Sequence, residues 1–348
     1  MGKITRLKDI AIAAEVSTPV VSAILNNKGE RFRQETRERI WRLAKEMNYF
    51  PAFSGRSLVT GKSYNIALAM PARYGGALSG HNLNIFHGLS LAIERTDYNL
   101  VIFFGCGEKY YTKLKQRRLD GVIVLQSTPD YDVISRSVET GLPVLVLNLD
   151  IDVEKAKDLS CVRSDHESLV KNAFKVFIEA GCKKILSIND YVSPCNPNII
   201  IYEEFNRQCQ KYSSEGVFGT TFCPSSKFKD QLYNMFNSGQ KWDGYFVDGS
   251  DYADELIEVA AEFGLKNDED YKLFVSSTDT HRMKFDYPCY LHSQREMGRT
   301  AWEMMEKMLS GETLNNKKVL IKYRPAEELH SDAIFNIDYE WEQLESNN

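Results

Sequence analysis

The pattern of hydrophobic and polar residues changes at about residue 64. Beyond that point, short apolar runs alternate with stretches in which apolar residues recur every three to four positions. Near-continuous apolar runs are typical of strands buried in a parallel sheet. We predict strands at 64–70, 99–104, 121–126, 143–149, 161–164, 184–189, 216–222, 243–248, 272–277, 289–292 and 318–323.

The amphipathic stretches between these runs predict helices. They include 84–95, 167–179, 228–238, 252–263 and 295–309. Alternating strands and helices are typical of α/β proteins with doubly wound parallel sheets. With 348 residues, the chain is long enough for two or three domains, each with its own core.

The first 50 residues have a helical pattern instead. Apolar spacing predicts a short helix over 8–14, with Glu15 and Val16 forming a turn. Ser17 then stands at an N-cap position, and Pro19 fills the first helical turn, where its missing N–H costs nothing. Two short helices joined by a tight turn predict a helix-turn-helix, although an ordinary helical hairpin has the same local pattern.

A third helix is predicted over 34–48, and Phe50-Pro51 ends it. The segment 52–60 is weakly apolar and contains Gly55, so it is marginal as an isolated helix.

Charge separates the same two regions. Residues 1–62 carry twelve Lys and Arg against six Asp and Glu, which is +6, so the total of −5 leaves −11 for the rest. A basic segment on an acidic body indicates that only the basic part meets a polyanion. The sequence has no apolar leader and no run of about 18 apolar residues, so we expect a cytoplasmic protein without a membrane partner. The seven dispersed cysteines are expected to be free thiols.

Residues 8–26 follow the pattern K-D-I-A-x-x-A-x-V-S-x-x-V-V-S-x-I-L-N, and Thr36–Ile40 and Asn48–Pro51 add two further matches. This combination resembles the LacI/GalR family of transcriptional regulators. The resemblance implies a helix-turn-helix domain at 1–50, a hinge segment at 51–63, and a two-lobed core like that of periplasmic sugar-binding proteins. The implied lobes are 64–160 with 288–323, and 161–287 with 324–348.

In the resembled family, the start of the second helix reads base edges, which implies this role for Thr18, Pro19 and Ala23. None of these side chains makes the bidentate contacts of glutamine or arginine, so we expect apolar contacts with thymine methyl groups. Ser17, Ser22 and Asn26 match positions that hold phosphates. The other implied DNA-binding residues are Leu7, Val20, Arg31, Arg56 and Leu58.

Leu58 matches the leucine that paired hinge segments of the family insert into the minor groove. Such a wedge makes specificity depend on DNA deformability. The alternative is a plain linker in which Leu58 packs on the next domain.

The resemblance also implies an effector pocket between the lobes, which in the family usually holds a sugar or a purine. Asp165 matches a pocket aspartate and Gln294 a pocket glutamine, although Asp165 also suits the N-cap of helix 167–179. Several other positions depart from the family. Ile201 replaces an arginine, Thr278 an aspartate, Ser250 (beside Asp251) an asparagine, and Tyr74, Ser79 and His81 an N-P-F-F loop. These departures predict an unusual ligand or none.

Motifs of catalysis are missing. The run Gly55–Ser63 has one residue too many for a phosphate-binding loop, and it leads into a strand. No H-E-x-x-H, G-x-S-x-G or metal-ligand spacing occurs, so we predict no enzyme, cofactor or metal.

The sequence therefore predicts a homodimeric repressor that binds a pseudo-palindromic double-stranded DNA operator and responds to a small-molecule effector. A solute-binding protein without a DNA role and an enzyme on the same scaffold are the alternatives.

Overall fold

The computed structural model describes residues 5–25, 29–49, 60–70, 80–104, 107–116, 118–125, 131–149, 159–191, 196–278, 283–314 and 317–329. The chain forms two compact units, Met1–Ser63 and Tyr64–Asn348, which we call the head and the core. The division lies where the hydrophobic pattern of the sequence changes. Each unit is described by itself.

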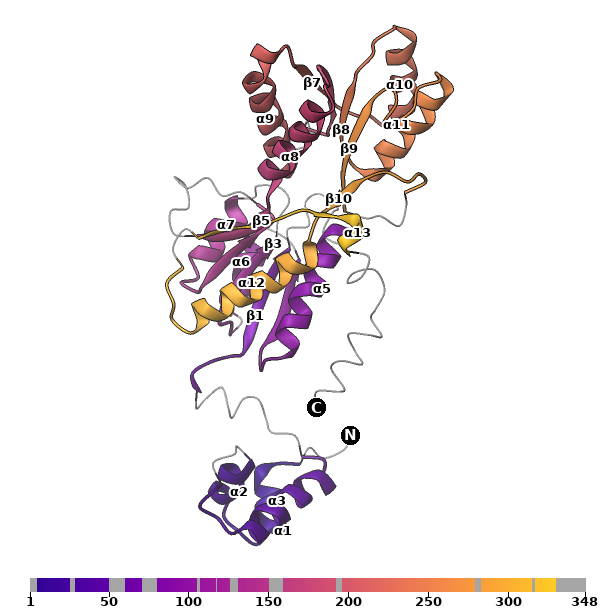
Figure 1. Ribbon diagram of the computed structural model, residues 1–348. Coiled ribbons are helices and arrows are strands. Elements are labelled where there is room, and N and C mark those ends of the chain that lie inside the picture. Colours follow the sequence, from indigo (N-terminus) through magenta and orange to yellow (C-terminus); the bar gives the residue numbers. More distant parts are fainter. Residues whose placement is uncertain are drawn as a thin grey trace. The chain divides into compact units, whose positions relative to one another are not determined.

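The described residues of the head form three helices, as predicted (Figure 1). These are α1 (Leu7–Ala13), α2 (Thr18–Leu25) and α3 (Gln34–Glu46). They bury a small shared cluster of Ile10, Ala11, Ala14, Val21, Ile24, Leu25, Ile40 and Ala44. Arg39 ties α3 to the end of α1, because its guanidinium donates a 2.8 Å hydrogen bond to the carbonyl oxygen of Ala14.

The described part of the core contains two six-stranded sheets, each in a lobe of its own. The first sheet has the order β11-β5-β4-β3-β1-β2, and all its neighbouring strands are parallel. Its strands are β1 (Asn65–Met70), β2 (Asn99–Phe104), β3 (Gly121–Leu125), β4 (Val144–Leu147), β5 (Ser160–Ser164) and β11 (Lys318–Ile321).

Helices cover both faces of the first sheet. Ile66 and Leu68 pack with α5 and α12, whereas the alternate residues Ala67 and Ala69 pack with α6 and α7. The bounds of these helices are α5 (Gly80–Glu94), α6 (Glu108–Gln116), α7 (Tyr131–Val138) and α12 (Gln294–Leu309). Strands buried on both faces explain the continuous apolar runs of the sequence.

The helices α5 and α12 lie side by side (Figure 1). A Cβ atom at Gly88 would overlap the carbonyl group of Arg295, and one at Gly298 would overlap the carbonyl oxygen of Ile85. Glycine at these two positions therefore permits the close backbone approach of the helices.

The second sheet has the order β12-β10-β9-β8-β6-β7 and is parallel except for the antiparallel β10–β12 pair. Its strands are β6 (Lys184–Ile188), β7 (Phe218–Phe222), β8 (Gly244–Asp248), β9 (Lys272–Ser277), β10 (Cys289–Leu291) and β12 (Arg324–Pro325). One face packs on α8 (His166–Glu179) and α9 (Asn196–Lys211), and the other on α10 (Phe228–Asn237) and α11 (Ser250–Glu262). The short elements η2 (Ser213–Glu215) and α13 (Ala326–Leu329) complete the described residues.

Within the described residues, the chain passes between the lobes three times: after Ser164, after Leu291, and between Ile321 and Arg324. The predicted lobe boundaries at 160 and 288 are therefore a few residues early. The reason is strand pairing, because β5 pairs with β4 and β11 in the first sheet, and β10 pairs with β9 and β12 in the second. Hydrophobic pattern identifies a strand but not its partner.

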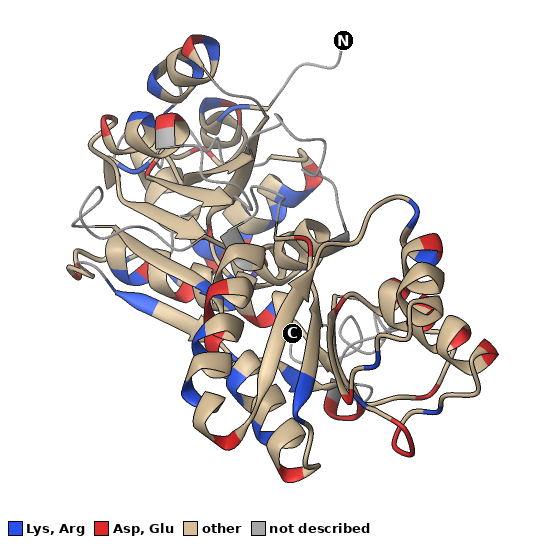
Figure 2. Ribbon diagram, turned by 90° about the horizontal axis from the view of Figure 1, so that it is seen from above, with Lys and Arg blue, Asp and Glu red and all other residues tan. Residues whose placement is uncertain are grey.

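Charged residues of both signs are distributed along the described helices (Figure 2). Among the described residues, no helix is long and apolar enough to cross a membrane.

Candidate nucleic-acid interface and inter-lobe site

The tight turn of the head is built at Glu15, whose φ of 50° lies in the left-handed region. A non-glycine residue adopts this conformation rarely, and here it reverses the chain directly after α1. The carbonyl oxygen of Ser17 then accepts hydrogen bonds from the N–H groups of Val20 (3.0 Å) and Val21 (3.3 Å), which begins α2. The predicted turn at Glu15 and Val16 thus has a defined geometry.

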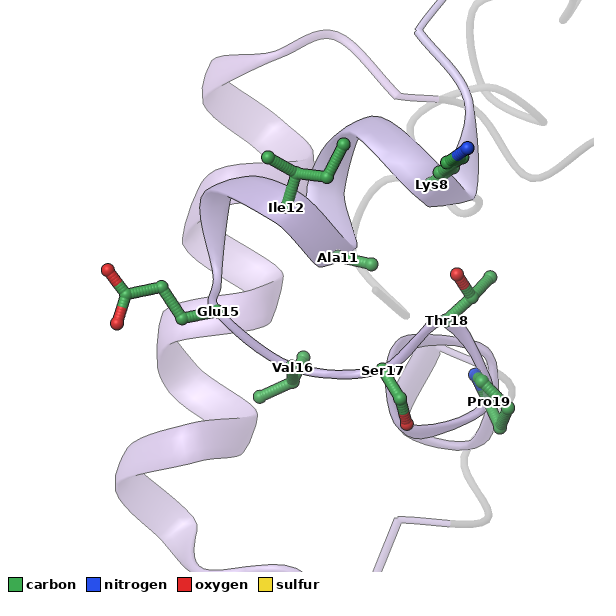
Figure 3. Close-up of a pocket in the computed structure, with 8 residues that line it drawn as sticks. All are labelled: Lys8, Ala11, Ile12, Glu15, Val16, Ser17, Thr18 and Pro19. Atoms are coloured by element: carbon green, nitrogen blue, oxygen red, sulfur yellow. The ribbon is translucent and has the colours of Figure 1, made fainter.

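A shallow pocket lies between α1 and the start of α2 (Figure 3). Thr18 points from the first turn of α2 toward the part of α1 that carries Lys8 (Figure 3). Ile12 also lines this pocket and is 68% exposed. The complete lining is Lys8, Ala11, Ile12, Glu15, Val16, Ser17, Thr18 and Pro19.

The predicted DNA-binding residues of the head differ in how much of their surface is available. Ser17, Pro19 and Arg31 are exposed, and the Arg31 guanidinium lies 5.0 Å from the centre of the Phe32 ring. The half-buried members are Leu7, Thr18, Val20, Ser22 and Ala23. Among these, Leu7 and Val20 pack against the buried cluster of the head, so part of their role is structural. Asn26, Arg56 and Leu58 lie outside the described residues.

In the core, the structure brings together two of the predicted effector residues, His81 at the start of α5 and Gln294 at the start of α12. The Nε2 atom of Gln294 lies 2.7 Å from Nδ1 of His81, and its Oε1 accepts a 3.0 Å hydrogen bond from the Asn84 amide. Along the chain, α5 is the helix after β1 and α12 the helix after β10. The carboxyl ends of strands are where α/β proteins bind ligands.

Asp165 lies directly after β5, where the chain leaves the first lobe. Its Oδ1 accepts a 3.1 Å hydrogen bond from the N–H of Ser168, so the side chain caps α8. The expectation that Asp165 caps this helix is therefore confirmed.

The other described members of the predicted effector set are more scattered. Ser250 is buried at the start of α11 and its Oγ accepts a 3.0 Å hydrogen bond from Ser277, whereas Asp251 and Thr278 are exposed. The prediction that Ile201 binds the effector is wrong. Its side chain is fully buried in the hydrophobic cluster between the second sheet and α8 and presents no surface to a ligand. Tyr74 and Ser79 lie outside the described residues.

Sequence reasoning missed three residues beside this site, His166, His292 and Tyr323. The His292 ring lies 5.4 Å from the His81 ring and 5.8 Å from the His166 ring, and Tyr323 hydrogen-bonds both His166 and His292. The signal in the sequence is their position, since each lies just after the end of a strand. Among the described residues, no group of His, Cys, Asp and Glu is arranged to hold a metal ion.

Burial controls the protonation of this region. It lowers the pKa of His81 to about 4, and the pKa of His166 to about 3 with a further contribution from the Arg163 charge. Burial also lowers the pKa of His292 well below its ordinary value. Burial opposes ionisation of Glu167, but hydrogen bonds from Arg163 override it and lower the pKa of Glu167 to about 2. Near neutral pH, the histidines are therefore uncharged and Glu167 is ionised.

Comparison with known protein families agrees with this architecture. The family model of bacterial regulatory proteins of the lacI family matches residues 6–52, and the model of periplasmic binding proteins and the sugar binding domain of the LacI family matches residues 84–195. These two segments of the chain therefore match models of the LacI family. The matched segments contain α1 to α3 in the head, and most of α5 together with α6 to α8 in the core.

Several LacI-family regulators are similar in sequence. The probable HTH-type transcriptional repressor ExuR of Bacillus subtilis is 32% identical over 52% of this chain and 54% of its own length. The sucrose operon repressor of Klebsiella pneumoniae is 35% identical over 41% of this chain and 43% of its own. The chain thus spans about half the length of these two relatives. The HTH-type transcriptional repressor CytR of Escherichia coli is 26% identical over 88% of this chain and 90% of its own.

Solved structures show the same fold at low sequence identity. The lac repressor dimer bound to operator and the anti-inducer ONPF is 17% identical, with a TM-score of 0.73 over 93% of this chain and 98% of that chain. The CelR–cellobiose complex is also 17% identical, with a TM-score of 0.61 over 92% and 98% of the two chains. The prediction of a helix-turn-helix head followed by two parallel-sheet lobes is confirmed.

Proposed function

We propose that the protein is a transcriptional repressor that binds a pseudo-palindromic DNA operator as a homodimer, and that a small molecule at the inter-lobe site modulates it. The observation that carries this proposal is the geometry of the head. A tight turn presents Ser17, Thr18 and Pro19 at the start of α2, next to Lys8 on α1. The basic charge of residues 1–62 supports contact with phosphates.

In this proposal, α2 enters the major groove. Thr18 and Ala23 offer methyl groups to thymine, and the exposed Ile12 extends the apolar part of the same surface. Ser17 and Lys8 contact phosphates, which fix orientation without reading sequence. Because bidentate base contacts are missing from these positions, DNA deformation is expected to supply much of the specificity.

Dimerisation follows from the operator. One head reads one half-site, so a two-fold symmetric operator requires two copies of the chain. The lac repressor, which has the same fold, binds its operator as a dimer, and this supports the assembly. A DNA-binding role also fits a cytoplasmic protein without catalytic activity.

The effector is proposed to be a small polar molecule of the carbohydrate class. Support comes from similar proteins, namely a sucrose operon repressor and the CelR regulator in complex with cellobiose. In this chain, His81, Gln294 and Asp165 supply hydrogen-bonding groups near the strand ends. The departure at Thr278, which is exposed, indicates a ligand different from that of a typical family pocket.

Selection of genomic fragments by the purified full-length protein, followed by titration of a selected duplex, tests the proposal. We expect binding that disappears when residues 1–63 are deleted, while ligand binding by residues 64–348 remains. Retained DNA binding after the deletion would overturn the role of the head. Failure of the full-length protein to select any sequence would favour the solute-binding alternative.

A further inference from the structure

Every described segment that joins the two lobes carries one polar ring. His166 follows β5, His292 follows β10, and Tyr323 lies between β11 and β12. We call these three residues the crossing cluster. A change in the relative orientation of the lobes has to move these segments, so the cluster lies where such a motion is controlled.

The three rings form one hydrogen-bonded unit. The Tyr323 hydroxyl lies 2.8 Å from Nδ1 of His166 and 3.0 Å from Nε2 of His292. The ring centre of Tyr323 is 4.4 Å from that of His292 and 5.7 Å from that of His166. Ser164 adds a contact to the other side of His292, with 3.3 Å between its Oγ and Nδ1.

The number of available protons limits the hydrogen bonds that these three side chains can form together. The Tyr323 hydroxyl has one proton, so it donates to one histidine and accepts from the other. Two neutral histidines satisfy this requirement, because one presents N–H and the other a lone pair. If both were protonated, two N–H groups would face one oxygen, and the Tyr323 proton would lose its acceptor among these groups. Full protonation therefore removes the hydrogen bond that the Tyr323 hydroxyl donates within this unit.

A single proton is also unfavourable on His166. Its side chain is 1% exposed, and its Nε2 has no hydrogen-bond partner among the described residues. A charged His166 would therefore bury an unsatisfied N–H group. His81 and His292 are half-buried, so His166 is expected to carry the strongest effect.

The surrounding charged groups do not compensate a proton on the cluster. On β5, Arg163 is buried and opposes protonation of His166. On α8, Glu167 favours that protonation, but both its oxygens accept hydrogen bonds from Arg163, and Asp165 caps its own helix.

The remaining elements around the cluster contribute groups with partners of their own. His81 of α5 is held by Gln294, Asp248 of β8 accepts a hydrogen bond from Ser276, and Glu296 of α12 is paired with Arg324. Asn148, buried at the end of β4, is uncharged. Burial and the Asp248 charge hold the pKa of Tyr323 well above its ordinary value, so its hydroxyl keeps the proton.

We propose that the crossing cluster is a pH-sensitive switch that joins the three inter-lobe segments when its histidines are neutral and releases them on acidification. The observed arrangement is fully favoured above the ordinary histidine pKa of about 6.5, and it weakens as the pH falls below that value. In the released state, the rings separate and become hydrated, which allows the lobes to reorient.

Hydrogen exchange of the full-length protein at pH 7.5 and 5.0, corrected for intrinsic rates, tests the switch. Consider one histidine that stays neutral in the joined state but can protonate in the released state. At 1.5 pH units below its ordinary pKa, this difference favours release by about 30-fold. We therefore expect peptides that contain residues 160–168, 288–296 and 320–326 to exchange at least about tenfold faster at pH 5.0. The H166Q/H292Q double variant cannot titrate at these positions and should lose this pH dependence, whereas H87Q on α5 should behave like the wild-type protein.

Equal protection of these peptides at both pH values in the wild-type protein would overturn the proposal. The same pH dependence in wild-type protein and the double variant would also overturn it. The Y323F variant retains the ring and removes only the shared hydroxyl, and it should exchange faster at pH 7.5 already. If the double variant fails to fold, Y323F together with histidine Cε1 resonances of the wild-type protein, which should titrate below pH 6, decides the matter.

Discussion

The head and the core assemble their candidate sites in different ways. In the head, Ser17, Thr18 and Pro19 are consecutive, and one turn and one helix start place them at the surface. In the core, His81 and Gln294 meet although 213 residues separate them, because sheet topology brings the starts of α5 and α12 together. A local site survives changes elsewhere in the chain, whereas a site built by topology depends on the packing that surrounds it.

Replacement of Arg163 should produce the largest difference in stability between the two regions, because it should destabilise the core and leave the head unchanged. Its guanidinium is buried and makes two hydrogen bonds to Glu167, of 2.6 and 2.9 Å, so R163M leaves a partly buried carboxylate without its partner. We expect the core to lose about 2–3 kcal/mol of unfolding free energy, a value reduced for the partial exposure of Glu167. Calorimetry should show a lower core transition and an unchanged head.

The exposed pair of Lys175 and Glu179 provides the control for this variant. K175M should change stability by less than about 0.5 kcal/mol. A loss in R163M no larger than in K175M would show that the buried pair does not stabilise the core.

Acidification should also affect the core and spare the head, because residues 1–63 contain no histidine. The pKa of His166 is lowered to about 3 in the folded core, so its contribution to stability is complete above the unfolded value of about 6.5 and declines below it. Because of His166 alone, the unfolding free energy of the core should fall by about 1 kcal/mol for each pH unit of acidification between pH 6 and 4.5. Thermal unfolding of wild-type protein and H166Q over this range measures the difference. An identical pH slope in the two proteins would contradict the assignment.

Asp165 distinguishes a structural role from a ligand role in the core. D165A removes the cap of α8 and should cost about 1 kcal/mol, whereas D165N keeps an oxygen that accepts from Ser168. If the carboxylate also binds the effector, both variants lose the effector response, measured as the ligand-induced shift in melting temperature. A normal response in D165N would limit Asp165 to capping.

A smaller effect is expected from T18S in the head. This change keeps the hydroxyl and removes the methyl group proposed to contact thymine, so operator binding should weaken by about 1 kcal/mol or less. Binding to a scrambled duplex should remain unchanged, because phosphate contacts carry no sequence information. Equal weakening on both duplexes would show that Thr18 positions α2 and does not read bases.

The contrast between locally built and topologically built sites also shows which features the sequence can predict. The three head helices and the alternating strands of the core are local patterns, and the structure confirms them. The partners of β5 and β10 depend on pairing between distant segments, so the predicted crossings between lobes are displaced by a few residues. Asp165 and Gln294 are recognisable through the resemblance to the LacI/GalR family. His166, His292 and Tyr323 also follow strand ends, but only the packing of the three inter-lobe segments brings their side chains together.

We infer that the head alone contacts DNA. Titration of a selected operator with full-length K8E and K171E at one salt concentration tests this inference. Lys8 lines the pocket between α1 and α2, whereas Lys171 is an exposed residue of α8 in the core. We expect K8E to weaken operator binding by at least about tenfold and to reduce the salt dependence of the affinity by about one phosphate contact or more. K171E should bind as the wild-type protein does. Equal affinities of K8E and wild-type protein, or an equal loss in K171E, would show that DNA binding does not depend on the head alone.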